Sequence, residues 1–401
     1  MTAALTICWL IIQVSGAETT GTGIGGDIKT NSFGGVFALW PDTGSSNLFV
    51  AKSTDGGANF SAPVTITTTV DSYDIGISNF AFRRALIYIT GGAYRTPTKN
   101  LVFAVWTDLT GATGCNSTAN EPGTSVSSTC KTRIWFARSV DGGTTWQAPS
   151  MMNNQVSLND QFNPWFAVDD TNGTLVVIYY DTVNDPGRLR TDVWAQISID
   201  DGVTWSPAKK LTSAQTDETV TGADIPGGGF FGDQYGDYNG LSGYMGRFFP
   251  SWTDRRTGGR EEIWTAKIPM TITQIKARIE TGNKVPGRNT RVYLGFEGKN
   301  GREFRMRTTD DANPFRKSTS KDVIFGTGSN VRDKNINDPT NPPMDETEIT
   351  GAYIRIEPRQ EEPWKIIGAQ VFINGRENPA FSLKLPSIVL EEDASEKISL
   401  G

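Results

Sequence analysis

Apolar and polar residues alternate along short segments of this chain, with a period of two rather than at helical spacing. Three such segments, 48–52, 134–138 and 193–197, each lead into a polar turn that contains glycine. A period of two places one row of side chains toward a core and the other toward solvent, as in a β-strand. We therefore predict an all-β protein.

The same eight-residue turn follows each of these segments without a gap. It occupies 53–60 (STDGGANF), 139–146 (SVDGGTTW) and 198–205 (SIDDGVTW). The Asp carboxylate can accept hydrogen bonds from the backbone N–H groups that follow it, and glycine tolerates a positive φ. The aromatic residue five positions later can fold back onto the sheet. We expect structural turns built on Ser53, Asp55, Gly57, Phe60, Ser139, Asp141, Gly143, Trp146, Ser198, Asp200, Gly202 and Trp205.

A second repeat lies upstream of the turns, where an apolar strand ends in an aromatic residue and then Asp. The repeated acids are Asp42, Asp108, Asp181 and Asp254, and the last precedes a strand at 263–267 that no such turn follows. Their spacing is that of a four-stranded blade with its loops, which indicates a radial repeat. A repeated position favours a structural hydrogen-bonding role over a catalytic one.

These turns resemble the Asp boxes of sialidase-like (BNR-repeat) β-propellers. The segments 232–238 (GDQYGDY) and 252–256 (WTDRR) are similar to the closing blade of secreted bacterial members. The resemblance covers residues 30–268 and implies a propeller whose boxes lie far from the sugar-binding face. Four blades are evident where the family usually has six or more. Either residues 1–30 and 64–100 supply the missing strands or, as we favour, the propeller is truncated at its N-terminus.

The composition changes after residue 268. Ten of the 11 Trp precede residue 269, whereas 20 of the 38 Lys and Arg lie in the last 133 residues. Alternating segments at 273–280, 291–295, 303–308, 352–357 and 369–373 are separated by Gly, Pro and Asn. We predict a β-sandwich at 269–386, followed by a frayed tail at 387–401.

Part of this sandwich is similar to PLAT (LH2-like) domains, through 279–283 (IETGN), 289–295 (NTRVYLG) and Trp364. The resemblance implies an accessory module that contacts a protein, lipid or glycan surface, in some members with Ca²⁺. The candidate calcium ligands are Asp310, Asp311, Asp333 and Asp338. Solvated loop acids are the alternative that we favour, and no other metal or cofactor is expected.

Histidine is absent from the sequence. This excludes Ser-His-Asp and Cys-His catalysis, and metal sites with His ligands. The net charge of −6 gives no electrostatic basis for binding nucleic acid or an anionic membrane. Cys115 and Cys130 flank the Ser/Thr/Gly-rich segment 116–129, and we predict a disulfide at the base of this loop, with two free thiols as the alternative.

The first 29 residues are ambiguous. Residues 3–14 are apolar and end near 15–17 (SGA), as in a secretory signal, but no Lys or Arg precedes Lys29. An internal strand of a longer chain is an equally good interpretation. The segment is too short to span a membrane, and no other stretch is a candidate. With the predicted disulfide, a secreted or extracellular location is expected.

Sialidases, by this resemblance, use a Tyr nucleophile paired with Glu, an Asp acid/base and three arginines that bind the sugar carboxylate. The best candidates for catalysis here are Tyr235, Tyr238, Asp237, Glu261 and Arg247. The alternative is that both tyrosines pack a closing blade and that Arg255 and Arg260 pair with surface acids. The first arginine of such a site normally precedes the first box, yet residues 1–52 contain none, and 82–85 (FRRA) is a faint match.

The sequence thus predicts an extracellular, glycan-directed protein that binds carbohydrate or protein without catalysis. Its C-terminal domain would contact a protein or lipid surface, and nucleic acid is not an expected partner. The alternative function is a sialidase-type exo-glycoside hydrolase. Both rest on the propeller resemblance, which is specific for fold and weak for activity.

Overall fold

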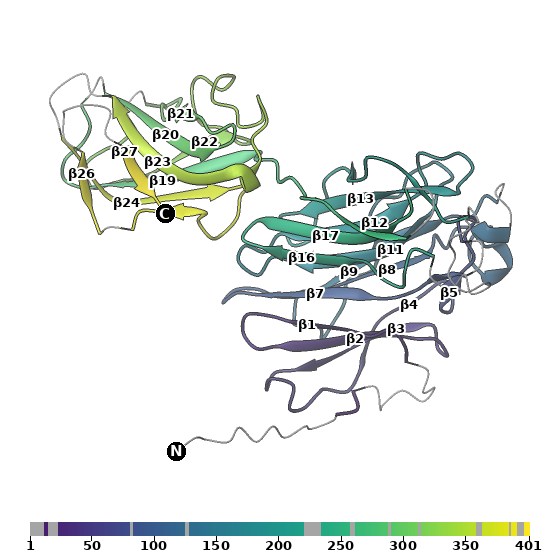
Figure 1. The fold of residues 1–401 in the computed structure, drawn as a ribbon. Helices are drawn as coiled ribbons and strands as arrows, with labels where there is room; N and C mark the ends of the chain where they lie inside the picture. The colour runs from purple at the N-terminus through teal and green to yellow at the C-terminus, as the bar shows by residue number, and fades with distance from the viewer. Residues whose placement is uncertain are drawn as a thin grey trace, which may run out of the picture. The chain divides into compact units, whose positions relative to one another are not determined.

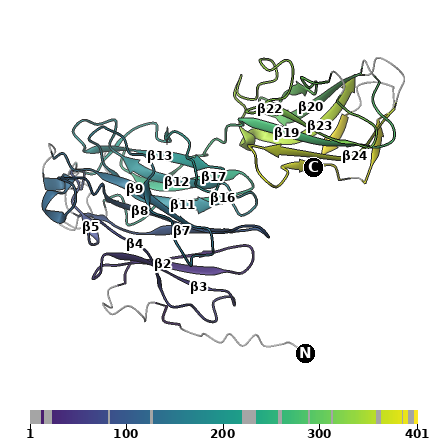
Figure 2. The same ribbon diagram turned by 180° about the vertical axis from the view of Figure 1, so that it is seen from behind.

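The protein is almost entirely built of β-strands, as predicted (Figures 1 and 2). The computed structural model describes residues 12–14, 23–80, 83–124, 128–219, 234–256, 261–287, 290–311, 314–357, 363–384, 386–390 and 397–401. Within these ranges the helical segments are three short 3₁₀ turns, η1 (Thr118–Asn120), η2 (Pro122–Thr124) and η3 (Glu346–Glu348). None of the helices in the described ranges has the length and apolar character needed to cross a membrane. The chain forms two compact units, Met1–Tyr244 with Phe248–Ile268, and Met245–Arg247 with Pro269–Gly401.

The first unit contains four antiparallel sheets in which consecutive strands are neighbours, the blades of a β-propeller. Blade 1 contains β1 (Asp27–Thr30), β2 (Val36–Asp42), β3 (Asn47–Ser53) and β4 (Val64–Thr68). Blade 2 contains β7 (Thr90–Arg95), β8 (Asn100–Leu109), β9 (Thr132–Ser139) and β10 (Ser150–Met151). Blade 3 contains β11 (Gln161–Val168), β12 (Leu175–Asp181), β13 (Arg190–Ser198) and β14 (Lys209–Lys210), with β15 (Thr216–Asp217) paired to β13. Blade 4 contains β16 (Gly240–Tyr244), β17 (Arg247–Asp254) and β18 (Glu262–Thr265).

The first strands of successive blades lie side by side around a common axis, β1 beside β7, β7 beside β11 and β11 beside β16. Apolar side chains fill the space between blades, and β8 contributes to two such cores. Its residues Val102, Ala104 and Trp106 pack toward blade 1, whereas Leu101, Phe103 and Val105 pack toward blade 3. This follows from the period of two, because β8 is buried on both faces.

The start of the propeller differs from the predicted boundary at residue 30. Gly23 already bridges to Asp42, and β1 begins at Asp27. The segment 64–100 supplies β4, the two-stranded hairpin β5 (Asp74–Ile75) and β6 (Ala85–Leu86), and β7, so strands missing from the repeat analysis do lie there. Most of the signal-like segment 1–17 lies outside the described residues, and Val14 packs against Trp40 and its neighbours.

The second unit is a β-sandwich, as predicted. One sheet contains β22 (Ser320–Gly326), β19 (Gln274–Thr281), β24 (Trp364–Ile373), β25 (Phe381–Ser382) and β26 (Ile388–Leu390). The other contains β21 (Glu303–Arg305), β20 (Arg291–Gly298), β23 (Ile349–Glu357) and β27 (Lys397–Leu400). Alternate residues of β19 and β20 meet in a single core, in which Trp364 is fully buried and its indole Nε1 donates to Thr281 Oγ1 (3.3 Å).

The prediction of a frayed tail at 387–401 is wrong for its described residues. β26 pairs with β24, and β27 pairs with β23. Ile398 and Leu400 are buried on the inner face of the sheet while Lys397 and Ser399 point outward. A four-residue alternation is too short to be recognised as a strand without the sheet that it completes.

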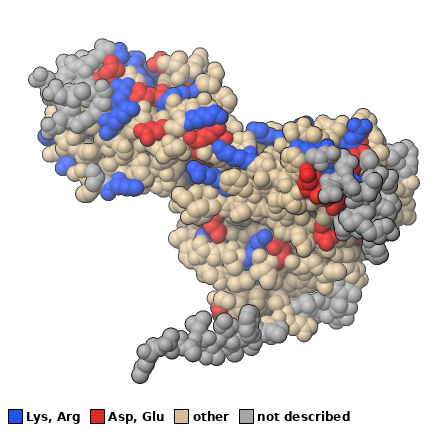
Figure 3. Space-filling model, viewed as in Figure 1, with Lys and Arg blue, Asp and Glu red and all other residues tan. Residues whose placement is uncertain are grey.

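Charged side chains are distributed unevenly over the two units. On the face seen in Figure 3, Lys, Arg, Asp and Glu are sparse over the propeller and dense, with both signs mixed, over the sandwich. This agrees with the excess of basic residues after residue 268. A group of charged residues on the propeller is therefore unusual for this face.

Candidate functional site

The three repeated turns have nearly identical hydrogen bonds. The Ser hydroxyl donates to the Asp Oδ1 in each, from Ser53 to Asp55 (2.7 Å), Ser139 to Asp141 (2.7 Å) and Ser198 to Asp200 (2.8 Å). The backbone N–H four residues after each Asp donates to the same Oδ1, at 3.0, 2.9 and 2.9 Å. The turns connect the third strand of a blade to the fourth, as expected for structural elements.

Each Asp of the turns is stabilised as a carboxylate. The side-chain amide of Asn59, followed by the hydroxyl of Ser53, lowers the pKa of Asp55 to about 2. Hydrogen bonds from Thr145, first from its backbone N–H, likewise lower the pKa of Asp141. The aromatic residue of each turn packs against the sheet, and Trp205 lies edge-on to Phe136 with ring centroids 5.2 Å apart.

The four repeated acids at the ends of the second strands are buried. Each carboxyl group accepts hydrogen bonds from a loop at that end of its blade. Asp108 accepts from the backbone N–H groups of Val70 (2.6 Å) and Asp71 (3.1 Å), and Asp181 accepts from Asn159 Nδ2 (2.6 Å). Asp42 and Asp254 accept from the backbone just after them. Burial raises the pKa of Asp108 to about 7 and that of Asp181 to about 6. These contacts support the structural interpretation of the second repeat.

A different set of residues meets at the propeller axis, and we call it the axial cluster: Lys29, Tyr88, Trp165 and Tyr238. Lys29 belongs to β1, Trp165 to β11, and Tyr88 and Tyr238 lie just before β7 and β16. The ring centroids of Tyr238 are 5.8 Å from Trp165 and 6.5 Å from Tyr88, and Lys29 Nζ lies 5.6 Å from the Trp165 ring centroid. Tyr238 is 65% exposed, so the cluster is open to solvent. Each blade, or the segment that enters it, therefore gives one side chain.

Local backbone features orient these rings. The backbone of Gly25, at φ +67°, lies so close to Tyr88 that a Cβ would come within 2.2 Å of its Cε1. A bulge interrupts β11 between Phe162 and Trp165, with Asn163 at φ +45°. Asn239 Nδ2 donates to the Asn163 carbonyl (2.7 Å) and ties this bulge to the segment that carries Tyr238. Bulges commonly re-aim a side chain at a functional site.

Two ion pairs accompany the aromatic rings. Lys29 Nζ lies 3.1 Å from Asp27 Oδ2, and that oxygen also accepts from Gly91 N (3.0 Å). Arg83 Nη2 lies 2.7 Å from Asp237 Oδ1, and the Asp237 side chain is 54% exposed. A saccharide at the axial cluster would therefore meet apolar ring faces together with carboxylate acceptors.

The five predicted catalytic residues differ in burial and in their neighbours. Tyr235 is fully buried, with its ring centroid 5.0 Å from both Phe80 and Phe162, and its hydroxyl accepts from Asn79 Nδ2 (3.2 Å). Burial raises the Tyr235 pKa well above its usual value, which opposes a nucleophilic role. The packing alternative thus holds for Tyr235, whereas Asp237 and Tyr238 are exposed beside the axial cluster.

Glu261 and Arg247 are exposed, and Glu261 and the buried Tyr235 both interact electrostatically with Glu218. Arg247 is exposed at the first residue of β17 and groups with the second unit. Glu261 is exposed and lies beside two residues that the sequence analysis did not assign to a site, Glu218 and Arg255. Glu218 Oε2 is 3.5 Å from Arg255 Nη1. Burial, and then the charge of Glu261, raise the pKa of Glu218 to about 8, so that Glu218 holds a proton at neutral pH.

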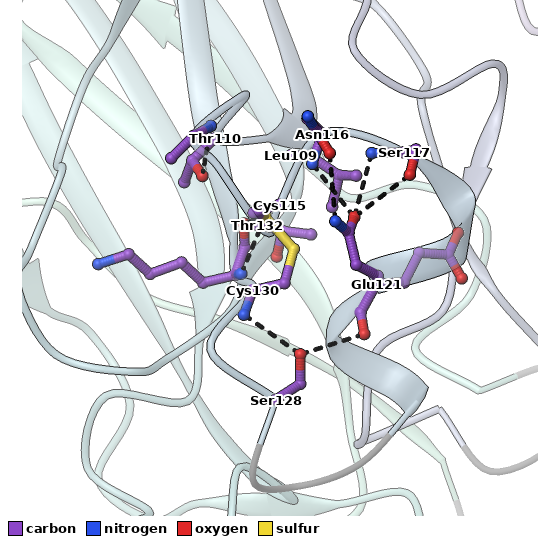
Figure 4. The surroundings of a disulfide bond; sticks show 12 residues. Leu109, Thr110, Cys115, Asn116, Ser117, Glu121, Ser128, Cys130 and Thr132 are labelled. Atoms are coloured by element: carbon purple, nitrogen blue, oxygen red, sulfur yellow. Dashed lines mark hydrogen bonds between the residues drawn. A yellow bond between two sulfur atoms is a disulfide. The ribbon is translucent and has the colours of Figure 1, made fainter.

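A disulfide joins Cys115 and Cys130, as predicted, and closes the loop that contains η1 and η2 (Figure 4). This loop supports the segment that carries Arg83. Gly123 N donates to the Gly76 carbonyl (2.7 Å), and Arg84 pairs with Glu121. At the base of the loop, Ser128 Oγ donates to the Glu121 carbonyl and accepts from Cys130 N (Figure 4).

The candidate calcium ligands of the sandwich are not gathered into a site. Asp310 pairs with Lys321 (2.8 Å), Asp311 pairs with Arg316, and Asp338 accepts from Thr340 N (2.8 Å). Asp333 is half-buried in a loop. Over the described ranges, no three His, Cys, Asp or Glu side chains lie close enough together to hold a metal ion.

A polar cleft of about 460 Å³ in the sandwich is lined by Gly326, Gly328, Ser329, Lys334, Asn335 and Asp338.

The sequence matches no family model and no curated protein. Solved structures similar to this chain include the Hadza microbial sialidase Hz136, with 14% identity over 63% of this chain and 46% of that chain (TM-score 0.38). An α-L-arabinofuranosidase from Lactobacillus brevis has 9% identity over 94% of this chain and 93% of that chain (TM-score 0.35). An N-acetylgalactosamine deacetylase from F. plautii, in complex with blood group B trisaccharide, has 12% identity over 65% of this chain and 69% of that chain (TM-score 0.35). This chain spans less than half of that sialidase, and with such low scores the assignment of the propeller rests on its own sheets.

Proposed function

We propose that this protein is an extracellular glycan-binding protein that holds a saccharide at the axial cluster. The observation that carries the proposal is the convergence of Tyr88, Trp165 and Tyr238 from three blades beside exposed carboxylate oxygens. Tyr and Trp combine an apolar face with a polar edge, which suits the C–H faces and hydroxyl groups of a sugar ring. Trp165 lies on a bulged strand, and Tyr88 and Tyr238 lie within two residues of the strands that follow them, which favours a preformed site.

Three further features support an extracellular, glycan-directed role. The turns repeat one sequence and one set of hydrogen bonds, which supports their likeness to the Asp boxes of secreted sialidase-like propellers. The Cys115–Cys130 disulfide fits an oxidising compartment. The sandwich would serve as a PLAT/LH2-like accessory module that contacts a protein, lipid or glycan surface, with Ca²⁺ as an added ligand if its loop acids gather around the ion.

Binding without catalysis is the simpler role for the residues at the axis. Tyr235 is fully buried, its hydroxyl is hydrogen-bonded to Asn79, and its raised pKa opposes a nucleophilic role. One observation favours the alternative, a glycoside hydrolase of the sialidase type. Glu218 and Glu261 are neighbouring carboxyl groups beside Arg255, and burial together with the charge of Glu261 raises the pKa of Glu218 to about 8. Such a pair can divide the roles of general acid and base.

A glycan array probed with the purified chain tests the proposal. We expect binding to a defined set of glycans, and loss of at least about 10-fold in affinity for Trp165→Ala and Tyr238→Ala, since each removes a stacking surface. The matched control is Tyr244→Ala, because Tyr244 is 66% exposed at the far end of β16 and lies outside the cluster. An array that stays blank, or equal binding by all three variants, contradicts the proposal.

Catalysis is tested separately with fluorogenic sialosides and arabinofuranosides. Release of the fluorophore by the intact chain, abolished in Glu218→Gln, would establish the hydrolase alternative. We expect no release above the uncatalysed rate. The same preparation must bind glycan on the array, so that an inactive result does not reflect a misfolded sample.

A further inference from the structure

We infer that the axial cluster takes a neutral saccharide rather than a sialic or uronic acid. This inference rests on the proposed function and specifies the chemistry of that same site. It is carried by the ion pairs of the basic side chains around the cluster. An acidic sugar requires arginine donors for its carboxylate, and here those donors hold protein carboxylates.

Recognition of a sugar carboxylate calls for arginine donors that are available to it, usually two on one guanidinium. At this end of the blades, five arginines already hold protein carboxylates. The pairs are Arg83 with Asp237, Arg84 with Asp74 and Glu121, Arg188 with Asp160, Arg255 with Glu218, and Arg256 with Asp254. Four of these five guanidinium groups hold an acid that is 4% exposed or less.

Displacing those acids is unfavourable. A sugar carboxylate that took Arg188 would leave Asp160 fully buried without its cation, and an uncompensated buried charge costs more than the new contact returns. The guanidinium groups therefore act as structural parts of the loops. They do not offer a clamp for an anionic ligand.

The two ion pairs at the cluster itself also favour a neutral ligand. Lys29 is shared between Asp27 and the face of Trp165, and Arg83 is held by Asp237. Asp237 keeps more than half of its side chain exposed next to Tyr238, so its carboxylate can accept hydrogen bonds from hydroxyl groups of a bound sugar. A neutral sugar supplies those hydroxyl groups, whereas a second carboxylate would meet repulsion from Asp237 and Asp27.

Calorimetric titration with matched ligands tests the inference. The probes are neutral oligosaccharides and, for each, the same oligosaccharide carrying a terminal sialic acid or a uronic acid in place of the hexose. We expect the neutral member to bind about 10-fold or more tightly than its acidic partner, and its affinity to change less than about twofold between roughly 50 and 500 mM NaCl.

Asp237→Asn probes the same point from the protein side. It releases Arg83, so we expect weaker binding of the neutral ligand and tighter binding of the acidic one. The matched control is Asp322→Asn, which releases Arg278 from a similar exposed pair (2.8 Å) in the sandwich and should leave both affinities unchanged. Equal or tighter binding of the acidic member by the intact chain, lost at high salt, overturns this inference and leaves the proposed function standing. Binding of neither member overturns both.

Discussion

The two ends of the propeller blades are built on opposite principles. At one end, where the third strand turns into the fourth, the same sequence forms the same hydrogen bonds in three blades. Near the other end and along the axis, the blades contribute unlike segments to one cluster, in which a lysine, two tyrosines and a tryptophan meet. Repetition therefore marks the parts that hold the scaffold, and departure from repetition marks the parts that can recognise a ligand.

The Asp residues illustrate the difference. In the turns, Asp55 and Asp141 are exposed and hydrogen-bonded as carboxylates, with lowered pKa values. At the loop end, Asp108 and Asp181 are buried and their pKa values are raised. The same side chain thus has a lowered pKa where backbone and side-chain donors stabilise its charge, and a raised pKa where burial removes its solvation.

Removal of the disulfide should have the largest effect. Its two cysteines are 15 residues apart, and a loop of that size stabilises a fold by about 3 kcal/mol through the unfolded state. We expect Cys115→Ser with Cys130→Ser to lower the free energy of unfolding by about that amount, measured by urea denaturation. Because this loop supports the segment with Arg83 and Tyr88, glycan affinity should fall as well. Unchanged glycan affinity in the folded double variant would mean that the loop does not support the binding site.

The dependence of stability on pH should differ in sign between the two ends. For Asp108, a pKa raised from 3.8 to about 7 means that its stabilising protonated form is fully present below about pH 4 and is lost as pH rises through 7. For Asp55, a pKa lowered to about 2 means that its contribution is present above pH 4 and is lost as pH falls toward 2. We expect the wild-type melting temperature to rise from pH 8 to pH 5, an effect on the order of 2 kcal/mol. Asp108→Asn should flatten this rise, and Asp55→Asn should not.

Truncation of a turn should have a smaller, local effect. Asp141→Ala removes the acceptor for Thr144 N, Thr145 N and the Ser139 hydroxyl, and we expect a loss of about 1–2 kcal/mol of unfolding free energy. Asp200→Ala should cost a similar amount, and the two losses should add because the turns lie in separate blades. Glycan affinity should be unchanged in the folded variants. A turn variant that lost binding would contradict the division between scaffold and site.

Substitutions of exposed tyrosines should have the smallest effect on stability. Tyr238→Ala and Tyr244→Ala remove side chains of nearly equal exposure, and each should change the free energy of unfolding by less than about 0.5 kcal/mol. The two variants should therefore differ in ligand binding alone. A large loss of stability in Tyr238→Ala would mean that the ring packs the closing blade.

The turns could be predicted from the sequence because all their hydrogen bonds join residues within a few positions of one another. The axial cluster could not, because Lys29 and Tyr238 are brought together by the whole ring of blades and no motif surrounds them. The Tyr235–Tyr238 segment shows the limit most clearly. A φ of +61° at Tyr235 turns its ring into the core while Tyr238, three residues later, points to solvent. Glu218 was overlooked because its raised pKa depends on burial and on Glu261, neither of which has a local signal.

The strand β8, whose alternate side chains enter two cores, has a consequence for how the propeller comes apart. A blade that shares its central strand with both neighbours cannot open at one interface without weakening the other. Blades 1 to 3 should therefore unfold together in a single cooperative transition, rather than fraying from one end as stacked repeats can. Blade 2 therefore links blades 1 and 3, and its packing determines how firmly they hold together.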